Sequence, residues 1–232
     1  MPLAFPSDYN ALIIGASGAI GDAFVRHLQS DPACAKVISL SRSANNLDLE
    51  DPESLKSIGS ELASSAPFHL IVDATGALTI DSIGPEKVLA RLDYEALQRS
   101  FAINAIGPAL LLKQLAPLLA NGDAIYAKLS ARVGSIADNK KGGWYGYRAS
   151  KAALNMLLQT AAIELQRRNP CLRVVALQPG TVRSNLSRPF EAGVPQLLEP
   201  EESVAGMMQA LLNLPAKAGA HFIDYRGHDI PW

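Results

Sequence analysis

Short runs of β-branched and other apolar residues alternate along this chain with longer stretches of helical periodicity. Such alternation is typical of βαβ units, in which a crossover helix returns the chain to a parallel sheet. It predicts an α/β protein with a parallel sheet between two helical layers. We expect strands at 11–14, 36–40, 68–73, 124–129, 173–177 and 221–225. We expect a first helix that carries Ile20 and ends near Asp31, and further helices at 52–63, 86–98, 100–119, 145–168 and 201–212.

The length of 232 residues suits one sizeable α/β domain and is short for two. We therefore expect residues 1–232 to form a single domain. Residues 179–200 combine several prolines with glycine between a predicted strand and a predicted helix. Excursions of this length inside a compact domain are often lids or binding loops. We predict that 179–200 is a substrate-binding loop, with a disordered connector as the alternative.

The charge of the chain is nearly balanced, with 21 basic and 22 acidic residues and a net charge of −1. This balance gives no overall attraction to nucleic acid or to an anionic membrane. Apolar runs such as 152–158 are far shorter than a membrane span, and we read no signal peptide at the N-terminus. Cys34 and Cys171 cannot form a disulfide framework. We expect a cytoplasmic protein whose partner is a small molecule, not a nucleic acid or a membrane.

Three glycines crowd the turn that follows the first predicted strand and opens the first predicted helix. Gly15, Gly18 and Gly21 permit a tight turn and a close approach of the backbone to a pyrophosphate. The helix N-terminus adds free N–H groups and a favourable dipole. A tight turn needed only for packing is the alternative. We predict a phosphate-binding turn built from Gly15, Ser17, Gly18, Ala19, Ile20 and Gly21.

The residues after the second predicted strand indicate which dinucleotide fits. A ribose 2′-hydroxyl is usually held by an acidic residue at this position, whereas a 2′-phosphate is accommodated by an arginine. The chain has Ser41, Arg42 and Ser43 here, and no acid. The guanidinium and the two hydroxyls can all donate to phosphate oxygens. We therefore favour NADP(H) over NAD(H), with a plain surface role for Arg42 as the alternative.

Tyr147 and Lys151 are four residues apart in a strongly helical stretch, so they share one helix face. A free tyrosine has a pKa of about 10 and is a poor acid or base near neutral pH. A nearby ammonium stabilises the phenolate, and we expect it to lower the pKa of Tyr147 toward a useful range. Such a pair also occurs by chance in many helices, so its meaning depends on the motifs around it.

Four motifs occur along the chain in the order of the short-chain dehydrogenase/reductase family and resemble those of that family, over essentially the whole chain. The turn Gly15–Gly21 resembles TGxxxGxG, and Tyr147–Lys151 matches YxxxK. Asn104 matches an asparagine in the family's fourth helix, and Pro179–Ser184 resembles PGxVxT. Asp73–Gly76 stands at the position of NNAG. Within the family, the stretch Ser130–Ser135 and the Gly-Gly-Trp-Tyr run are similar to the C-factor and carbonyl-reductase-like branch.

The resemblance implies a three-layer doubly wound Rossmann fold and a short-chain oxidoreductase. Its reaction would transfer hydride between NADP(H) and a carbonyl or alcohol substrate. The alternative is a nucleotide-binding regulatory or signalling protein that keeps the fold and the cofactor with little turnover. We expect no metal. We expect self-association to a homodimer or homotetramer, through the Ala- and Leu-rich face of the helix at 145–168.

The resemblance also implies roles for individual residues. Tyr147 would protonate the carbonyl oxygen during reduction, and Lys151 would lower its pKa and hold the nicotinamide ribose. Asn104 would anchor a water that relays protons. Thr181 and Val182 would lie against the nicotinamide carboxamide. The cofactor contacts that we assign beyond the phosphate-binding turn are Ser41, Arg42, Asp48, Leu49, Ala74, Thr75, Gly76, Asn104, Tyr147, Lys151, Pro179, Gly180, Thr181 and Val182.

The chain departs from the family pattern at three places. Ala19 replaces the second glycine of the turn, and the segment Asp73–Thr75 replaces the first residues of NNAG. Ala131 stands where the substrate-orienting serine is expected. The flanking hydroxyls are Ser135, which we favour, and Ser130, which is the alternative. Without either hydroxyl, Tyr147 alone would stabilise the oxyanion.

Overall fold

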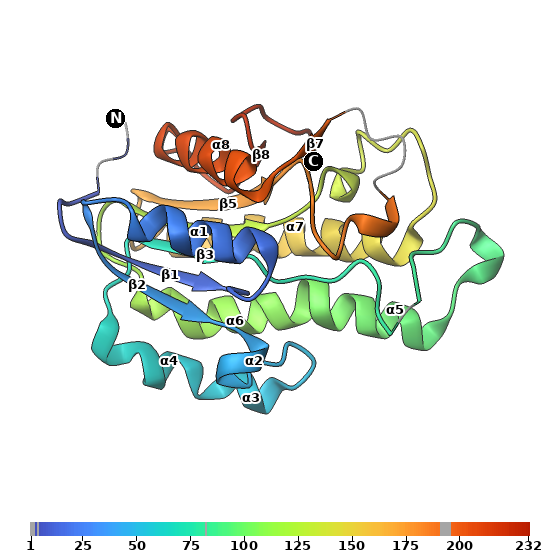
Figure 1. Cartoon of the computed structure of the whole chain (residues 1–232), viewed down its shortest axis with the longest axis horizontal. Coiled ribbons are helices and arrows are strands. Elements are labelled where there is room, and N and C mark those ends of the chain that lie inside the picture. The colour runs from blue at the N-terminus through green and yellow to red at the C-terminus, as the bar shows by residue number, and fades with distance from the viewer. Residues whose placement is uncertain (1–2, 4, 82, 191–195) are drawn as a thin grey trace.

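The described residues build a six-stranded sheet in which all neighbouring strands are parallel. The computed structural model describes residues 3, 5–81, 83–190 and 196–232. The strand order is β2-β1-β3-β4-β5-β8 (Figure 1). All six predicted strands are confirmed, with ends that shift by two residues or fewer. They are β1 (Tyr9–Ile14), β2 (Cys34–Leu40), β3 (Leu70–Asp73), β4 (Ala124–Leu129), β5 (Leu172–Gln178) and β8 (His221–Asp224).

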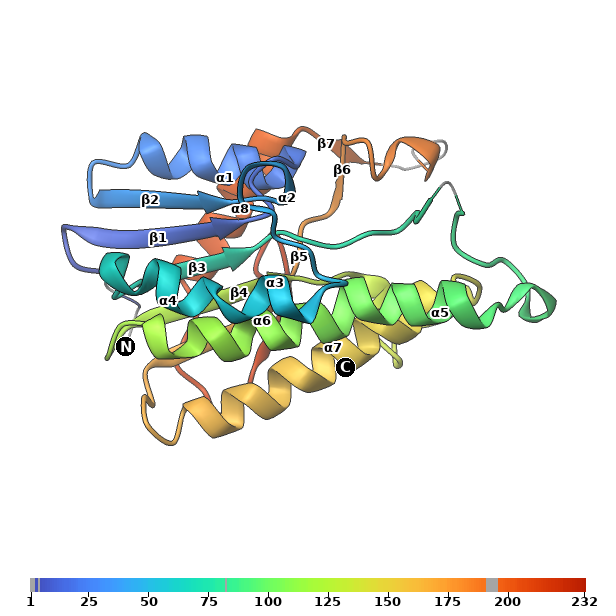
Figure 2. The same cartoon turned by 90° about the horizontal axis from the view of Figure 1, so that it is seen from below.

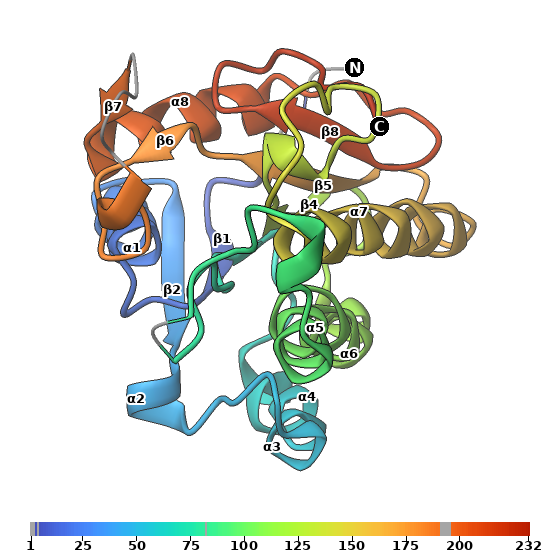
Figure 3. The same ribbon diagram turned by 90° about the vertical axis from the view of Figure 1, so that its right-hand side faces the viewer.

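Helices cover both faces of this sheet (Figure 3). Because successive strand residues point to opposite faces, Leu12 and Ile14 join one core and Ile13 joins the other. The three-layer, doubly wound arrangement expected from the sequence is therefore confirmed. One face carries α1 (Ala19–Gln29) and α8 (Pro200–Leu212), and the other carries α5 (Tyr94–Phe101), α6 (Gly107–Leu115) and α7 (Tyr145–Leu165).

The winding of the chain reverses direction between β1 and β3. The chain leaves β1 outward to β2, then returns past β1 to β3 and continues to β4, β5 and β8. The connections therefore separate at the carboxyl ends of β1 and β3, and this separation opens a crevice there. In doubly wound sheets, ligands bind at this position.

The helix predicted at 52–63 is divided in two. α3 (Pro52–Lys56) and α4 (Ile58–Leu62) are separated at Ser57. Asp51 caps α3, since its carboxylate accepts a hydrogen bond from the Glu53 N–H at 2.9 Å. Two short helices bury their apolar residues against α6 in place of one longer helix.

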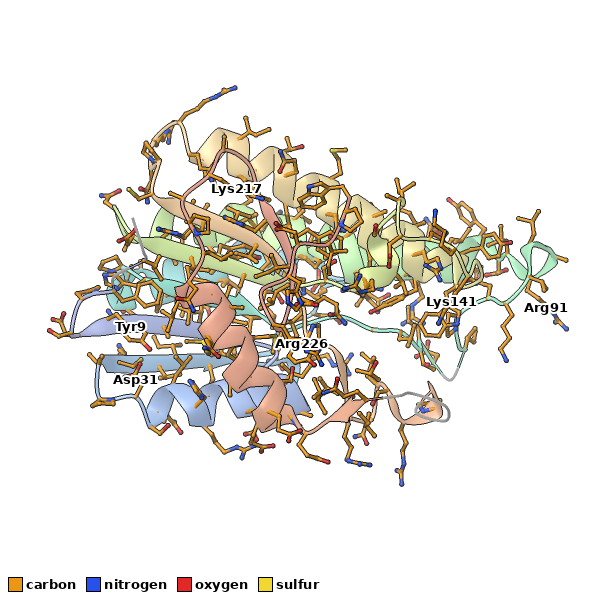
Figure 4. The ribbon with its side chains drawn as sticks, turned by 90° about the horizontal axis from the view of Figure 1, so that it is seen from above. Tyr9, Asp31, Arg91, Lys141, Lys217 and Arg226 are labelled. Carbon is orange, nitrogen blue, oxygen red and sulfur yellow. The ribbon has the colours of Figure 1, made fainter. Side chains whose placement is uncertain are left out.

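An extended segment after β3, residues 77–93 other than 82, is called the arm below. The helix predicted at 86–98 is wrong over its first half, because the only helical turn in the described arm is a 3₁₀ turn at Leu89–Arg91. Figure 2 shows the arm extending beyond the N-terminal end of α5. Figure 4 places Arg91 near its far end, opposite Tyr9 and Asp31 at the other end of the molecule.

The local sequence explains why α5 begins at Tyr94 and not earlier. Asp93 is its N-cap, and its carboxylate accepts a hydrogen bond from the Ala96 N–H at 2.9 Å. Val88 and Leu89 have helical spacing from later apolar residues, but both side chains are exposed. No buried face therefore exists to stabilise a helix over the first half of the predicted range.

The helix predicted at 100–119 is part of a longer helical run. α5 passes through a π-helical turn at Ala102–Ile106 into α6, and a 3₁₀ turn ends the run at Leu118. By length and apolar composition alone, Tyr94–Leu118 is the one described helical run that could cross a membrane. This is weak evidence, because core helices of soluble proteins have the same composition. In this structure Leu111 and Leu115 lie in the core under the sheet.

The predicted loop at 179–200 has more structure than expected. β6 (Thr181–Val182) pairs in parallel with β7 (Leu197–Leu198), and a 3₁₀ turn lies at Arg188–Phe190. Residues 191–195 of the predicted loop lie outside the described residues. Both ends of the segment are therefore held beside the carboxyl edge of β5.

The strand at one edge of the sheet, β8, is partly covered by the residues that follow it. The Ile230 N–H donates to the Phe222 carbonyl at 2.8 Å, and the Asp224 N–H donates to the His228 carbonyl at 2.9 Å. The ring of Trp232 lies 5.2 Å from that of Phe222. The returning chain therefore occupies the outer hydrogen-bonding groups of β8.

Candidate active site

The glycine-rich turn between β1 and α1 leaves no room for side chains at two positions. A Cβ on Gly21 would lie 2.2 Å from the Gly15 carbonyl oxygen, and Gly15 has a φ of +80°. The N-cap of α1 is Gly18, so no side chain occupies the amides of the first turn. Ala19 is the first residue of α1. This cradle fits a pyrophosphate, which binds through free backbone N–H groups at a helix N-terminus.

Arg42 lies at the end of β2 beside this turn. The Gly15 N–H donates to the Leu40 carbonyl at 2.8 Å, which ties the turn to the end of β2. Ser41 is buried, and its hydroxyl caps the short helix α2 (Arg42–Asn45) by accepting from the Ala44 N–H at 3.2 Å. The Arg42 side chain is exposed and pairs with no acidic side chain in the described part of the protein. Its guanidinium is therefore available for an anion.

Asp48 and Leu49, two further residues that were predicted to contact the cofactor, follow α2. The Asp48 carboxylate accepts a hydrogen bond from the Glu50 N–H at 2.9 Å. Leu49 packs against the core, and its carbonyl oxygen would lie 2.5 Å from a Cβ on Gly107. Leu49 therefore sits where this segment meets α6, and Asp48 is only half-buried.

A buried ion pair that sequence reasoning missed lies at the carboxyl ends of β3 and β4. Lys128 Nζ is 2.9 Å from Asp73 Oδ1, and both side chains are fully buried. Lys128 also donates to the Thr75 carbonyl at 2.6 Å and to the Thr75 hydroxyl at 2.9 Å. The Thr75 hydroxyl donates to Asp73 Oδ1 at 2.6 Å. The only signal in the sequence is one lysine in an apolar strand, since the pairing itself depends on the register of β3 and β4.

This network fixes the turn 74–76, which was predicted to contact the cofactor. Burial lowers the pKa of Lys128, and the Asp73 carboxylate opposes that shift. A Cβ on Gly15 would lie 3.0 Å from the Ala74 carbonyl carbon, so the turn 74–76 touches the phosphate cradle. The ion pair therefore holds one wall of the crevice in place.

Asn104 lies on the π-helical turn between α5 and α6 and is completely buried. Its Oδ1 accepts from the Ala77 N–H at 3.0 Å, and its Nδ2 donates to the Ala77 carbonyl at 2.8 Å. The side chain thus pins the first residue of the arm to the helical layer. π-Helical turns are frequent at functional sites.

Gly76 brings the predicted residues of the site together. A Cβ there would lie 3.2 Å from Asn104 Oδ1 and 3.3 Å from Lys151 Nζ. Lys151 Nζ also donates to the Leu129 carbonyl at 3.1 Å, and it lies 5.7 Å from the centre of the Tyr147 ring. Asn104, Tyr147 and Lys151 therefore meet at the carboxyl ends of β3 and β4.

The pKa of Tyr147 shifts in the opposite direction from the one that the sequence predicted, and the pKa of Lys151 shifts as well. Burial raises the pKa of Tyr147, whereas the sequence alone predicted that Lys151 would lower it. Burial also lowers the pKa of Lys151 to about 7, with a further contribution from the Lys128 charge and opposition from Asp73. Removal of water from the phenol is the cause of this rise, and the nearby ammonium of Lys151 does not offset it. Near neutral pH the phenol is protonated and the lysine is only partly charged.

The two candidate serines have different partners. The Ser130 hydroxyl is buried and donates to Asn155 Oδ1 at 2.7 Å. The Ser135 hydroxyl accepts from the Asp138 N–H at 3.0 Å and donates to no acceptor in the described residues. Ala131 separates the two and begins the turn that contains Gly134. That turn approaches α7 closely, since a Cβ on Gly134 would lie 2.8 Å from Lys151 Cβ.

The segment after β5 forms the opposite side of the crevice. Gly180 has a φ of +81°, and its Cβ would lie 2.7 Å from Leu198 Cδ1. The Pro179 carbonyl accepts from the Ser203 hydroxyl at 2.6 Å. Thr181 is half-buried and Val182 is buried. A fixed backbone therefore presents the four residues of this segment that were predicted to contact the cofactor, of which Thr181 and Val182 were predicted to contact the nicotinamide.

A cavity of about 760 Å³ lies between the arm, α5 and the start of α7. Its apolar walls come from the arm, and Tyr147 contributes to its lining beside Gly146. Among the described residues, no group of three or more His, Cys, Asp or Glu side chains could hold a metal. The apolar arm residues that line the cavity are Leu78, Ile80, Ile83 and Val88.

Comparison with known proteins is consistent with this geometry. The family model described as short chain dehydrogenase matches residues 43–194. A 1-hydroxy-2-glutathionyl-2-methyl-3-butene dehydrogenase of Rhodococcus sp. (strain AD45) is 30% identical, over 80% of this chain and 78% of that protein. The C-signal protein of Myxococcus xanthus is 35% identical, over 62% of this chain and 83% of that protein. A short-chain dehydrogenase/reductase of Burkholderia multivorans with bound NADP superimposes with a TM-score of 0.79 and 26% identity, covering 97% of this chain and 100% of that one.

Proposed function

The chain belongs to the short-chain dehydrogenase family and is an NAD(P)-dependent oxidoreductase, and from this premise we propose that it reduces a carbonyl compound with NADPH. The observation that carries the proposal is the meeting of Asn104, Tyr147 and Lys151 around Gly76, beside the phosphate cradle. A proton donor, a lysine that can bind the nicotinamide ribose and a dinucleotide cradle at one crevice are the parts that hydride transfer to a carbonyl needs.

The cofactor preference is assigned to Arg42. NADP(H) would supply the hydride, and the backbone of Gly15–Gly21 would hold its pyrophosphate. Arg42 and the hydroxyl of Ser43 would bind the 2′-phosphate, because the guanidinium is free and no acid follows β2. The Burkholderia structure with bound NADP supports this choice, and NAD(H) remains the alternative.

The proton is assigned to Tyr147. Burial raises the pKa of its phenol, so the side chain is protonated at neutral pH and ready to donate to a carbonyl oxygen. The reverse reaction needs the phenolate, which burial disfavours. Reduction is therefore the direction that we propose. Lys151 would hold the nicotinamide ribose, and Asn104 would keep the start of the arm against it.

Ser135 is our choice for the substrate-orienting hydroxyl. The Ser135 hydroxyl donates to no acceptor in the described chain, so it can donate to a substrate. The Ser130 hydroxyl already donates to Asn155 Oδ1. Ser130 remains the alternative.

An apolar carbonyl compound of moderate size is the substrate class that we propose. The cavity beside Tyr147 holds about 760 Å³, and apolar residues of the arm line it together with charged side chains of the arm and α5, which suits a small organic ligand. The segment 179–200 would close over the substrate as its binding loop, within a single domain over 1–232. Of the basic residues near this opening, Arg183 pairs with Glu199 at 2.8 Å, which argues against a strongly anionic substrate.

We also propose a cytoplasmic homodimer, with a homotetramer as the alternative. α7 exposes Met156, Leu157 and Ile163, and Leu157 also lines a groove of about 600 Å³ between α6 and α7. Apolar helix faces of this kind commonly meet a symmetry mate. Both cysteines are free thiols, which fits a reducing compartment.

A regulatory protein with little turnover is the second candidate. The likeness to the C-signal protein favours it, as does Ala131 at the position of the expected serine. The two candidates differ in one measurement, because a regulator would bind the cofactor without consuming it.

The first test is a calorimetric titration of the protein and of Arg42→Ala with NADPH and NADH. We expect NADPH to bind about tenfold to a hundredfold more tightly than NADH, since charged hydrogen bonds contribute about 1.5–3 kcal/mol. The variant should lose that preference. Equal affinities in the unmodified protein would remove the role of Arg42.

Activity follows with a panel of apolar ketones and aldehydes and the variant Tyr147→Phe. We expect a loss of about 100-fold or more in kcat with unchanged NADPH affinity. Cofactor binding with no turnover of any compound would favour the regulatory candidate.

A further inference from the structure

We propose that Glu86, in the arm, is a positioning residue that holds the first turn of α7 and thereby the side chain of Tyr147. Its catalytic consequence rests on the proposed function, whereas its contact with α7 does not. The Pro85-Glu86-Lys87 segment has no role in the reaction as described so far, and it lies far in sequence from the helix that it contacts.

The start of α7 lacks a cap of its own. The N-cap residue is Trp144, and its side chain provides no cap hydrogen bond. The first amides of a helix have no partner within the helix and need one from elsewhere. Here Glu86 supplies two acceptors: its carbonyl accepts from the Trp144 N–H at 2.5 Å, and its Oε2 accepts from the Gly146 N–H at 3.0 Å.

Gly146 makes this contact possible. A Cβ at this position would lie 2.9 Å from Glu86 Oε1 and 3.2 Å from Leu97 Cδ2. The missing side chain lets the carboxylate reach the backbone amide directly. Tyr147 is the next residue, and Glu86 and Tyr147 both line the 760 Å³ cavity.

The approach to α7 needs external support. Gly142, Gly143 and Trp144 have φ values of +63°, +65° and +54°. Glycine tolerates this region, but for tryptophan the left-handed conformation is strained and persists only where its surroundings impose it. The bond to Glu86 is such a constraint. The carboxylate charge also stabilises the positive end of the α7 dipole.

The arm is itself anchored, so that it can hold the helix. Arg99 on α5 pairs with Asp81 in the arm and with Glu50 at 2.8 Å. Asn104 holds the arm where it leaves β3. Glu86 therefore joins a fixed wall of the cavity to the helix that carries the proton donor. A substrate that contacts this wall would thus affect the placement of Tyr147.

The test compares Glu86→Ala and Glu86→Gln with the unmodified protein, and uses Glu61→Ala, an exposed glutamate of α4, as the matched control. The first readout is amide hydrogen exchange by NMR at Trp144 and Gly146, without substrate. In Glu86→Ala we expect exchange at Gly146 to rise about fivefold or more, because losing a cap costs about 1 kcal/mol. Glu86→Gln keeps an acceptor, so it should recover most of the protection.

The second readout is steady-state kinetics on an accepted ketone. In Glu86→Ala we expect kcat to fall about tenfold with NADPH affinity unchanged, because a small displacement of the proton donor slows the chemical step. Glu86→Gln should stay within about threefold of the unmodified protein, since the hydrogen bond remains.

Three outcomes would overturn the proposal. One is unchanged exchange at Gly146 in Glu86→Ala. A second is equal loss of activity in the alanine and glutamine variants together with faster exchange throughout the protein, which indicates a purely structural residue. The third is faster exchange at Gly146 with unchanged kcat. If the unmodified protein reduces no carbonyl compound, the proposed function fails, while the exchange measurement still decides the contact of Glu86 with α7.

Discussion

The turn after β1 and the arm after β3 both leave the carboxyl edge of the same sheet, but they are held in different ways. The turn is fixed by backbone shape, because Gly21 lies so close to Gly15 that no side chain fits between them. The arm is fixed by charged side chains, through Arg99 with Asp81 and through Glu86 with the start of α7. The first conformation is local, whereas the second depends on elements far away in the sequence.

The two regions meet at the turn 74–76, which a buried ion pair holds in place. Ala74 touches Gly15 on one side, and Gly76 touches Asn104 and Lys151 on the other. The buried pair of Asp73 and Lys128 lies beneath. Variants of the buried charges, of the glycines and of the exposed charges should therefore have effects of different sizes.

The largest effect is expected when one partner of the buried pair is removed. Asp73→Asn leaves Lys128 without an opposite charge inside the protein. We expect the free energy of unfolding to fall by about 3–5 kcal/mol in urea denaturation at pH 7. The double variant Asp73→Asn/Lys128→Met should regain part of this loss, because the methionine removes the buried charge that the single variant leaves without a partner. A single variant as stable as the unmodified protein would show that the pair does not hold the turn.

The next effect is a pH dependence that comes from Lys151. Burial lowers its pKa to about 7 from an ordinary value of 10.5. Between these values the unfolded chain binds more protons than the folded one, so stability rises as the pH is raised from 7 toward 10. We expect a gain of about 2–4 kcal/mol over this window. In Lys151→Met the gain should be smaller, because only Lys128, whose pKa burial also lowers, then contributes in this window; chemical denaturation at several pH values would measure the difference. An identical pH profile in both proteins would contradict the lowered pKa.

A smaller effect is expected when a glycine of the phosphate-binding turn is replaced, and a smaller one still when a glycine of the arm is replaced. Gly21→Ala places a Cβ against the Gly15 carbonyl, and overpacking of this kind costs about 1–3 kcal/mol. We expect NADPH affinity to fall about tenfold to a hundredfold in a calorimetric titration. Gly84→Ala in the arm is the matched control, since a Cβ there meets no atom within 4 Å. Equal losses in the two variants would remove the distinction between the two regions.

The smallest effect is expected at the exposed anchor of the arm. Asp81→Asn breaks the ion pair with Arg99, whose side chain is partly exposed. Such pairs contribute about 0–1 kcal/mol and weaken in salt. We expect a loss below about 1 kcal/mol in thermal or urea unfolding, and faster amide exchange confined to the arm. A loss as large as that of Asp73→Asn would mean that the arm is part of the core.

The difference between local contacts and contacts over a long distance in the sequence also explains what the sequence could predict. The strands, the glycine turn and the spacing of Tyr147 and Lys151 depend on neighbours within a few residues, so the sequence predicted each of them. The start of α5 was missed, because Val88 and Leu89 have helical spacing but no surface to pack against. Periodicity shows which residues could share a face, and it does not show whether that face is covered.

The site was predicted in part for the same reason. Asn104, Tyr147 and Lys151 do meet, but the pKa of Tyr147 moves upward, since burial is a property of the folded protein. Asp73 and Lys128 are 55 residues apart in the sequence, and only the register of β3 and β4 pairs them. The contact of Glu86 with Gly146 spans 60 residues. Contacts of this kind need the tertiary structure.

The chain that returns along β8 determines how the sheet can grow. Residues 228–230 already use outer hydrogen-bonding groups of that strand, so another strand cannot add there without displacing them. β2 is the edge that stays open, and it carries Lys36, whose ammonium donates to the Ser65 hydroxyl at 3.0 Å. A lysine on an edge strand discourages pairing with foreign strands. If copies of this protein extend the sheet, that extension should begin at β2 and not at β8.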